Sequence, residues 1–155
     1  MPREARVTAE LPLLIADLYE AAGALRAHGQ QLAAPAGQSQ ARWQVLSVLS
    51  EGDWTVAQAA RRLGVTRQAV QRLVNDLQAD GLVSSQPNPR HARSPLLRLT
   101  ELGRRALDQI TQAASAWHRV AAEGLSVTDL LTTRTVLRHL IAATAPASVK
   151  HSRRR

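Results

Sequence analysis

Residues 55–83, TVAQAARRLGVTRQAVQRLVNDLQADGLV, contain the pattern that decides the fold. They predict two short helices joined by a tight turn. Thr55 and Thr66 can each cap the start of a helix, because a threonine hydroxyl accepts a hydrogen bond from a free backbone N–H of the first turn. Gly64 and Gly81 can end the two helices, where a left-handed backbone suits a residue without Cβ.

The apolar positions of this stretch lie where two packed helices need them. The second helix carries a stripe at the spacing i, i+3, i+4 and i+7, formed by Val70, Leu73, Val74 and Leu77. On the first helix, the small residues Ala59 and Ala60 allow the two helices to cross closely. Together with the tight turn, this pattern predicts a helix-turn-helix.

The opposite face of the second predicted helix is polar and carries no acid. At about 100° per residue, an arc of roughly 100° contains Gln68, Gln71, Arg72 and Asn75, with Arg67 at its edge. Arginine, glutamine and asparagine pair with guanine and adenine edges in the major groove. A plain solvated helix face is the alternative interpretation. The caps, the turn and the charge of the chain favour DNA readout.

The basic charge of the chain is concentrated near this stretch. The 155 residues carry a formal net charge of +8, and every basic residue except Lys150 is an arginine. Between Thr55 and Arg105, nine arginines stand against three acids. Because the planar guanidinium matches phosphates and base edges, this localisation favours a nucleic-acid partner over a general bias in composition.

The composition excludes several classes of site. Without cysteine, the chain has no disulfide framework, zinc–thiolate site or thiol redox switch. The five histidines are scattered without metal-ligand spacing, and no phosphate loop or nucleophile elbow is present. We therefore expect no cofactor, no metal and no enzyme activity. No apolar run approaches the ~18–20 residues needed to span a membrane, and no signal peptide is visible, so we expect a cytoplasmic protein.

The residues before the helix-turn-helix predict two more helices. Thr8 is placed to cap a helix over residues 8–31 with Pro12 in its first turn, and the first seven residues are expected to be loose. A loop with proline and glycine follows at 33–40. A mostly buried second helix is expected from Ser39 or Gln40 to about Ser50.

The periodicity changes to that of strands after the helix-turn-helix. Residues 82–86 and 95–99 predict two strands joined by a turn-rich basic loop, which is a β-hairpin wing. Leu97 and Leu99 are expected to point inward. At the tip of the wing, arginines are expected to enter a minor groove; the alternative is a flexible loop that touches only phosphates. The predicted DNA-binding residues are Thr55, Thr66, Arg67, Gln68, Gln71, Arg72, Asn75, Arg90, Arg93 and Arg98.

Two further helices are predicted between residues 100 and 143, followed by a basic tail at 144–155. Their apolar faces, with that of residues 8–31, are too large for one small lobe to bury. We therefore expect a homodimer in which these helices pair, while residues 39–99 form the DNA-binding lobe of a single domain. A two-fold dimer presents two reading helices about 34 Å apart. A monomer with one packed core is the alternative.

Three segments carry a family resemblance: QAARRLGVTRQAVQRLVNDLQADGLV, then RLTELG after the wing, and EGLSVTDLLTTRTVLRHL near the end. In this order they resemble the MarR family of bacterial transcription regulators over residues 8–143. The strongest single marker is Arg98-Leu99-Thr100 with Gly103. The resemblance implies a mainly α winged-helix homodimer on a pseudo-palindromic operator, associated with the nucleoid, with residues 66–80 as recognition helix. We expect a repressor.

The wing departs from the family pattern at one position. The family's wing usually carries Asp-x-Arg, and the corresponding residues here are His91-Ala92-Arg93. The arginine is kept, whereas histidine replaces the acid that would orient it. This replacement predicts a less rigid wing and a mildly pH-sensitive DNA contact.

The resemblance also implies a small aromatic or phenolic effector between the dimerisation helices and the DNA-binding lobe. Candidate ligand-binding residues by position are Tyr19, His28, Trp43 and Trp117. Ordinary core or interface roles are the alternative for each of them. Oxidant sensing through cysteine is excluded.

Two other binding functions compete with a sequence-specific regulator. An architectural, sequence-tolerant DNA-binding protein would share the charge, but the Gln/Arg/Asn arc favours specificity. A winged helix used for protein contact would be expected to show an acidic or apolar outer arc, which this sequence lacks.

Overall fold

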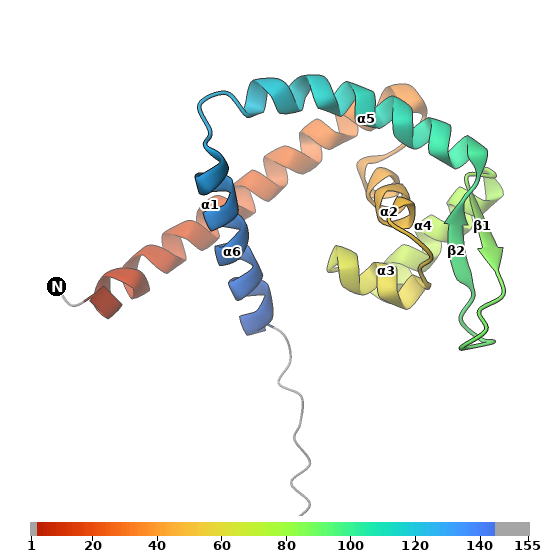
Figure 1. Ribbon diagram of the computed structural model, residues 1–155, viewed down its shortest axis with the longest axis horizontal. Helices are drawn as coiled ribbons and strands as arrows, with labels where there is room; N and C mark the ends of the chain where they lie inside the picture. The colour runs from red at the N-terminus through yellow and green to blue at the C-terminus, as the bar shows by residue number, and fades with distance from the viewer. Residues whose placement is uncertain (1–2, 145–155) are drawn as a thin grey trace, which may run out of the picture. The chain divides into compact units, whose positions relative to one another are not determined.

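The computed structural model describes residues 3–144 and confirms a mainly α fold with a small two-stranded sheet (Figure 1). The chain divides into two compact units, Met1–Ala116 and Trp117–Arg155, which are described separately. The elements are α1 (Arg3–Ala33), a 3₁₀ turn η1 (Ala34–Ala36), α2 (Gln40–Ser50), α3 (Val56–Leu63), α4 (Arg67–Ala79), β1 (Val83–Gln86), β2 (Leu96–Leu99), α5 (Glu101–Ala121) and α6 (Val127–Thr144). The basic tail predicted at 144–155 falls, from residue 145 on, outside the described residues.

The first helix begins earlier than the sequence predicted. It starts at Arg3, so the expectation of a loose start is wrong for residues 3–7, and Thr8 is not the cap of the helix. Residues 1–2 lie outside the described residues. Instead, the Thr8 hydroxyl donates to the carbonyl of Glu4, 2.9 Å away, which is a bond made inside a helix. Residues 3–7 are mostly good helix formers, and Glu4 in the first turn suits the positive helix end. Pro12 therefore lies in the helix interior rather than in its first turn.

Both helices of the predicted helix-turn-helix form as expected. At α3, the Thr55 hydroxyl accepts from the Gln58 N–H, and the Gln58 side chain accepts from the Thr55 N–H, which completes a capping box. Gly64 ends α3 with φ +68°, in the left-handed region. At α4, the Thr66 hydroxyl accepts from the Ala69 N–H at 3.2 Å.

The end of α4 leads directly into the wing. Gly81, with φ +71°, reverses the chain, and the Leu82 N–H donates back to the Leu77 carbonyl at 2.8 Å. This six-residue bond is the Schellman closure of a helix. After this closure, Leu82 and Val83 are buried in the core, and β1 begins at Val83.

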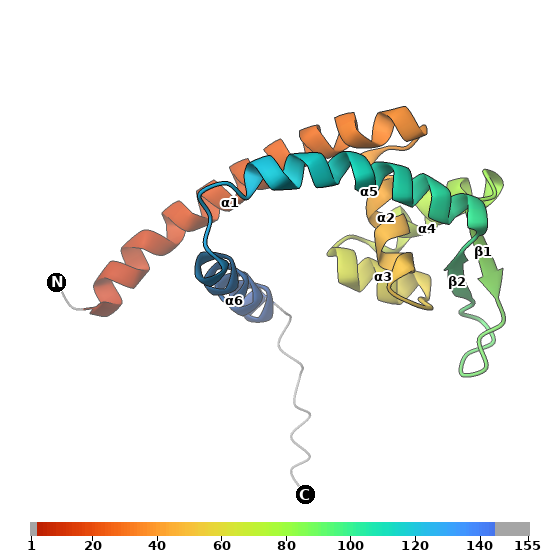
Figure 2. The same cartoon turned by 45° about the horizontal axis from the view of Figure 1, so that its top comes forward.

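The wing is an antiparallel hairpin in which Val83 pairs with Leu99 and Gln86 with Leu96 (Figure 2). Leu97 and Leu99 are buried and Arg98 is exposed, as the alternation predicted. The sequence did not predict that Trp54 pairs with Leu97 on the other side of β2, where the Leu97 N–H donates to the Trp54 carbonyl at 2.7 Å. The wing is thus attached to the residue that leads into α3.

One aliphatic core holds the DNA-binding lobe together. Its buried members come from α2, α3, α4, both strands and the first half of α5, and the largest include Leu46, Leu77 and Leu97. Trp43 and Trp54 are half-buried against this cluster. Burying such side chains is the main favourable term in folding. The core therefore fixes α4 and the wing on a single support.

In the second unit, helix α6 exposes its apolar residues instead of burying them in a core. The Ser126 hydroxyl accepts from the Asp129 N–H at 3.1 Å and so caps the start of α6. No residue of α6 is buried in the single chain. Its exposed apolar residues include Leu130, Leu131, Val136 and Ile141. None of the helices in residues 3–144 combines the length and apolar character that crossing a bilayer requires.

Gly103 lies in the first turn of α5, at the point where that helix meets the end of α4. A Cβ built there would lie 2.0 Å from the Leu82 carbonyl oxygen, whereas one at Gly23 in α1 would meet nothing within 4 Å. We expect Gly103→Ala to destabilise the protein by about 3 kcal/mol, since backbone must move to relieve the clash. Gly23→Ala should add roughly 0.5 kcal/mol through helix propensity. Urea unfolding followed by circular dichroism checks both, and equal stabilities would contradict the packing described.

Candidate DNA-binding interface

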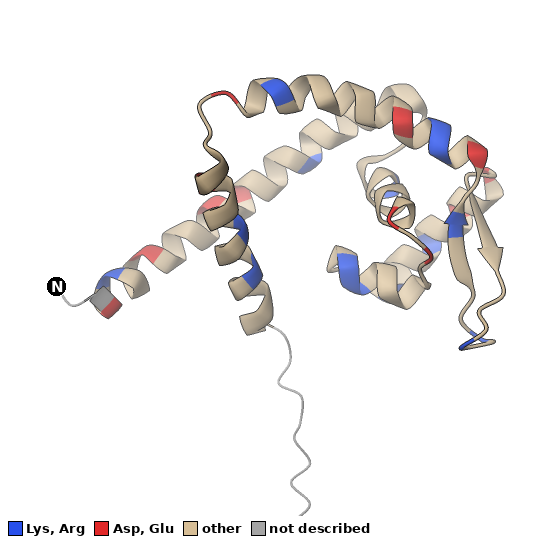
Figure 3. Cartoon of the chain, viewed as in Figure 1, with Lys and Arg blue, Asp and Glu red and all other residues tan. Residues whose placement is uncertain are grey.

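The outer face of α4 is exposed and polar along its length. Gln68, Gln71, Arg72 and Asn75 are all exposed, and Arg67 is exposed at the start of the helix. The Gln71 side-chain amide donates to the Asn75 side-chain oxygen at 2.8 Å, so these two residues orient one another. Figure 3 shows basic positions on α3, α4 and the wing. The arc expected from the helical wheel is therefore present and available to a partner.

The tip of the wing is ordered by a residue that the sequence reasoning missed. The Asn88 side-chain amide donates to the Ser94 carbonyl at 2.7 Å, and its oxygen accepts from the Arg90 N–H at 3.0 Å. The Ser94 N–H also donates to the His91 carbonyl at 2.9 Å. An Asn–Pro pair is a turn signal in sequence, but its partners across the loop are not visible there.

Two hollows lie between the helix-turn-helix and the wing. One is lined by residues of α4, including Arg67 and Gln71, and by Arg93 and Ser94 of the wing. The other is lined by Gln58 and Arg61 of α3 and by wing residues Asn88, Arg90 and His91. The structure thus brings Arg67, Gln71, Arg90 and Arg93 to the same side of the lobe, and adds Arg61, which was not predicted.

The two predicted threonine contacts serve the backbone of the lobe. Thr55 is buried, and its hydroxyl both accepts from Gln58 N–H and donates to the Gln58 side-chain oxygen at 2.9 Å. Thr66 is exposed at the start of α4, and its hydroxyl is used by the Ala69 N–H. Thr55 also lines both hollows between the helix-turn-helix and the wing, and each threonine holds the start of its helix in place.

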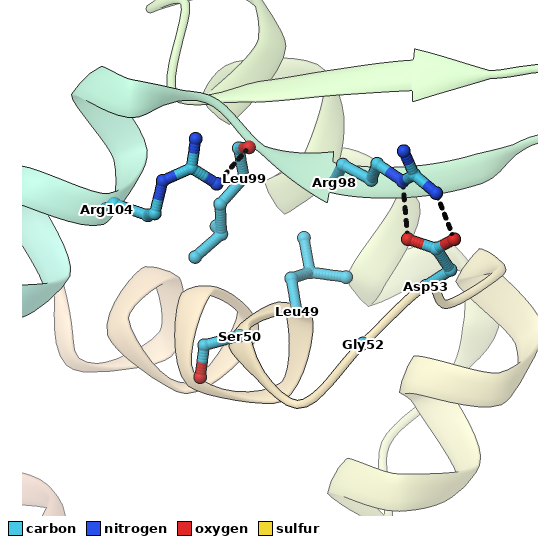
Figure 4. A pocket seen from close by; sticks show the side chains of 7 residues that line it. All are labelled: Leu49, Ser50, Gly52, Asp53, Arg98, Leu99 and Arg104. Atoms are coloured by element: carbon cyan, nitrogen blue, oxygen red, sulfur yellow. Dashed lines mark hydrogen bonds and ion pairs between the residues drawn. The ribbon is translucent and has the colours of Figure 1, made fainter.

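Arg98 points toward an acid rather than into open solvent. Figure 4 shows its guanidinium bonded directly to the Asp53 carboxylate at one side of a pocket. Leu49, Ser50, Gly52, Leu99 and Arg104 also line this pocket. The hydrogen bonds from Arg98 hold the pKa of the Asp53 carboxyl below its usual range. Across the same pocket, Arg104 donates to the Leu99 carbonyl at 3.3 Å. Whether Arg98 also contacts DNA remains a prediction.

Two polar contacts fix the C-terminal half of α4. Arg42 on α2 forms an ion pair with Asp80 at the helix end, with a nitrogen–oxygen distance of 2.5 Å. The Gln78 side chain donates to the Ser85 hydroxyl on β1 at 2.7 Å. Tertiary contacts of this kind have no periodicity of their own, so no pattern in the sequence predicts them.

The four candidate ligand residues lie in different surroundings. Tyr19 on α1 is 77% exposed. His28 and Trp43 are half-buried, and Trp43 lines a pocket with Leu25 and Gly29 of α1 and Arg62 and Leu63 of α3. Trp117 belongs to the second unit, where its ring lies 5.4 Å from that of His118. Of the four, Trp43 is the one that borders a described pocket.

The amino-acid sequence is similar to those of known proteins. A model of the MarR family matches residues 37–94. The uncharacterized protein Rv2011c of Mycobacterium tuberculosis is 51% identical over 134 residues, which cover 86% of this chain and 94% of that protein. The transcriptional activatory protein BadR of Rhodopseudomonas palustris is 31% identical over 99 residues, 61% of this chain and 57% of BadR.

Solved structures with the same fold agree with this assignment. A variant of Escherichia coli MarR in complex with operator DNA has a TM-score of 0.71 at 21% identity, covering 84% of this chain and 95% of that one. CouR of Rhodococcus jostii bound to p-coumaroyl-CoA has a TM-score of 0.73 at 25% identity, covering 79% and 87%. Over residues 37–94, which the family model matches, the chain belongs to the MarR family of DNA-binding transcription regulators, whose members are not enzymes.

Proposed function

We propose that this regulator works as a homodimer on a pseudo-palindromic operator, represses transcription there, and is released by a small aromatic ligand. The observation that carries the proposal is the acid-free outer face of α4 next to the wing arginines on one side of one rigid lobe. Such a face suits base edges in the major groove, and the wing arginines suit the minor groove beside it. The operator complex of the related Escherichia coli protein supports this use of the fold.

Exposed apolar surface supports the homodimer. Helix α1 exposes eight large apolar side chains between Val7 and Leu25 in the single chain, and no residue of α6 is buried. Monomeric proteins rarely leave large contiguous apolar patches in water. Two-fold pairing of these helices would cover them and would also place two copies of α4 on successive turns of DNA.

Repression is the proposed sign of regulation because a bound dimer excludes polymerase from DNA that it covers. The relative BadR is named as a transcriptional activatory protein, so activation is the alternative to repression. A reporter driven by the protein's own upstream region distinguishes the two. Deletion of the regulator should raise reporter output, and a fall in output would identify an activator.

The pocket beside Trp43 supports a ligand-controlled release. Apolar walls from Leu25 and Leu63 and the Trp43 ring suit an aromatic body, and Arg62, which pairs with Glu51 at 3.3 Å, suits a carboxylate. The p-coumaroyl-CoA complex of CouR shows that a relative of this fold takes an aromatic ligand.

A sequence-tolerant architectural DNA-binding protein is the alternative function. It would show no preference between an inverted repeat and unrelated DNA, together with a steep dependence on salt. Competition between the two duplexes at fixed salt separates this alternative from an operator-specific regulator.

Arg72→Ala tests base readout by α4. If the guanidinium is bidentate to a guanine, its loss should cost about 1–3 kcal/mol of discrimination at one base pair. Arg93→Ala should instead weaken binding similarly for operator and scrambled duplexes if it meets only phosphate. Fluorescence anisotropy with both duplexes measures this, and Arg119→Ala on the exposed end of α5 is the control. An Arg72 variant with unchanged discrimination would refute the assignment.

Leu130→Glu tests the dimer. Leu130 is 46% exposed in the single chain, and a charge there should oppose burial between two copies. Thr132→Glu is the control, because two residues further along α6 lie on roughly the opposite side of the helix. We expect sedimentation velocity to show monomer for Leu130→Glu and dimer for the control. Loss of the dimer should also lower operator affinity. A Leu130→Glu variant that remains dimeric would count against this interface.

Trp43→Phe tests the ligand pocket. Free 4-hydroxycinnamate is the probe, and its binding should quench tryptophan fluorescence and lower operator affinity in the wild type. The fluorescence change should disappear in Trp43→Phe and persist in Trp117→Phe. Quenching that survives the Trp43 substitution would place the ligand elsewhere.

A further inference from the structure

Two charged residues face each other where the wing joins the helix-turn-helix. Arg98 donates through Nε and Nη2 to the two carboxylate oxygens of Asp53, both at 2.5 Å (Figure 4). Two parallel bonds between a guanidinium and a carboxylate fix orientation as well as distance. The partners are 45 residues apart in the sequence, so the pair joins β2 to the segment before α3.

The backbone register explains why these two side chains meet. Trp54 and Leu97 form an antiparallel bridge, with one bond of 2.7 Å from the Leu97 N–H. One residue further on each side, Asp53 lies opposite Arg98, as cross-strand neighbours do. The ion pair therefore extends a single backbone attachment into a two-point attachment along β2.

The attachment joins the two parts that would read DNA. Asp53 lies two residues before Thr55, whose capping box fixes the start of α3. Arg98 lies five residues after Arg93, on the strand that runs back from the wing tip. A change of orientation between Asp53 and Arg98 would therefore move the wing tip relative to α4.

We propose that Asp53 and Arg98 are positioning residues for DNA binding, whose ion pair holds the wing at the distance from α4 that lets both grooves be engaged together. Arg98 then acts through Asp53 and the wing rather than by meeting a phosphate. This inference rests on the proposed operator binding and replaces a direct DNA contact as the role of Arg98.

Because the ion pair is exposed, its effect on DNA binding can be measured apart from any effect on folding stability. The side chains of Arg98 and Asp53 are 55% and 37% exposed, and exposed ion pairs contribute little to folding free energy. Substitutions should thus alter DNA binding in a protein that still folds. A direct phosphate contact by Arg98 predicts the opposite sign for Asp53→Asn, because that change removes an anion and frees a cation, which would tighten binding.

The experiment uses full-length Asp53→Asn, Arg98→Gln, the double variant, and the charge swap Asp53→Arg with Arg98→Asp. Glu51→Gln is the matched control, since it breaks the exposed Arg62–Glu51 pair of the same lobe and removes one negative charge in the same way. The probe is a labelled duplex with the inverted repeat that the wild type selects from a random pool. Affinity is measured by anisotropy, and thermal melting confirms folding.

We expect Asp53→Asn and Arg98→Gln to weaken binding by a similar factor, about threefold to tenfold, with the double variant no worse than either. The charge swap should recover most of the affinity, and Glu51→Gln should bind at least as well as the wild type. In a background that lacks Arg90 and Arg93, Asp53→Asn should have no further effect. Binding by Asp53→Asn that equals or exceeds that of Glu51→Gln, or additive losses in the double variant, would overturn the proposal.

A second measurement needs no DNA. Hydrogen exchange of residues 83–99 should be faster in Asp53→Asn and Arg98→Gln than in the wild type, and unchanged in Glu51→Gln. Unchanged exchange in the first two variants would overturn the proposal even if no duplex were bound. Failure of the wild type to prefer any duplex would refute operator binding alone. If the single variants did not fold, the charge swap would test the proposal by itself. Wild-type hydrogen exchange and affinity in the charge swap would support the proposal, and loss of both in a folded protein would overturn it.

Discussion

The lobe depends on one close approach of backbone to backbone. After the left-handed Gly81, the Leu82 carbonyl accepts from the Thr100 N–H at 3.0 Å, and the Thr100 hydroxyl donates to the Gly81 carbonyl at 2.7 Å. The same hydroxyl accepts from the Gly103 N–H at 3.0 Å and so begins α5. The end of α4, the base of the wing and the start of α5 therefore meet at one junction. Gly103 is required there because a side chain would collide with the Leu82 carbonyl.

Helix α4 and the wing are attached to the lobe by different contacts. Helix α4 is held by its buried stripe of Val70, Val74 and Leu77 and by the Arg42–Asp80 pair at its end. Strand β2 of the wing pairs with β1 on one side and contacts Trp54 and Asp53 on the other. Both attachments end on the same aliphatic core. The relative placement of helix and wing is thus a property of the lobe and does not need DNA to form.

Local rules predicted most of this lobe from the sequence. Thr55 and Thr66 cap α3 and α4 as predicted, because the short-range hydrogen bonds of a helix cap depend on neighbouring residues alone. The rule failed at Thr8, where good helix formers on its N-terminal side continue the helix. The Asn88 contacts in the wing and the Asp53–Arg98 pair were also missed. Each joins residues whose closeness is created by tertiary structure, so no spacing in the sequence predicts it.

The separation between scaffold and reading face has an evolutionary consequence. Within residues 3–144, the outward residues of α4 make no hydrogen bond to the junction at Gly81 and Thr100, and the bond between Gln71 and Asn75 stays within the outer face itself. Surface substitutions of this kind usually change folding free energy by less than about 0.5 kcal/mol. With the proposed readout by α4, paralogues built on this lobe would acquire new target sites by a few exchanges along one helix, without passing through misfolded intermediates.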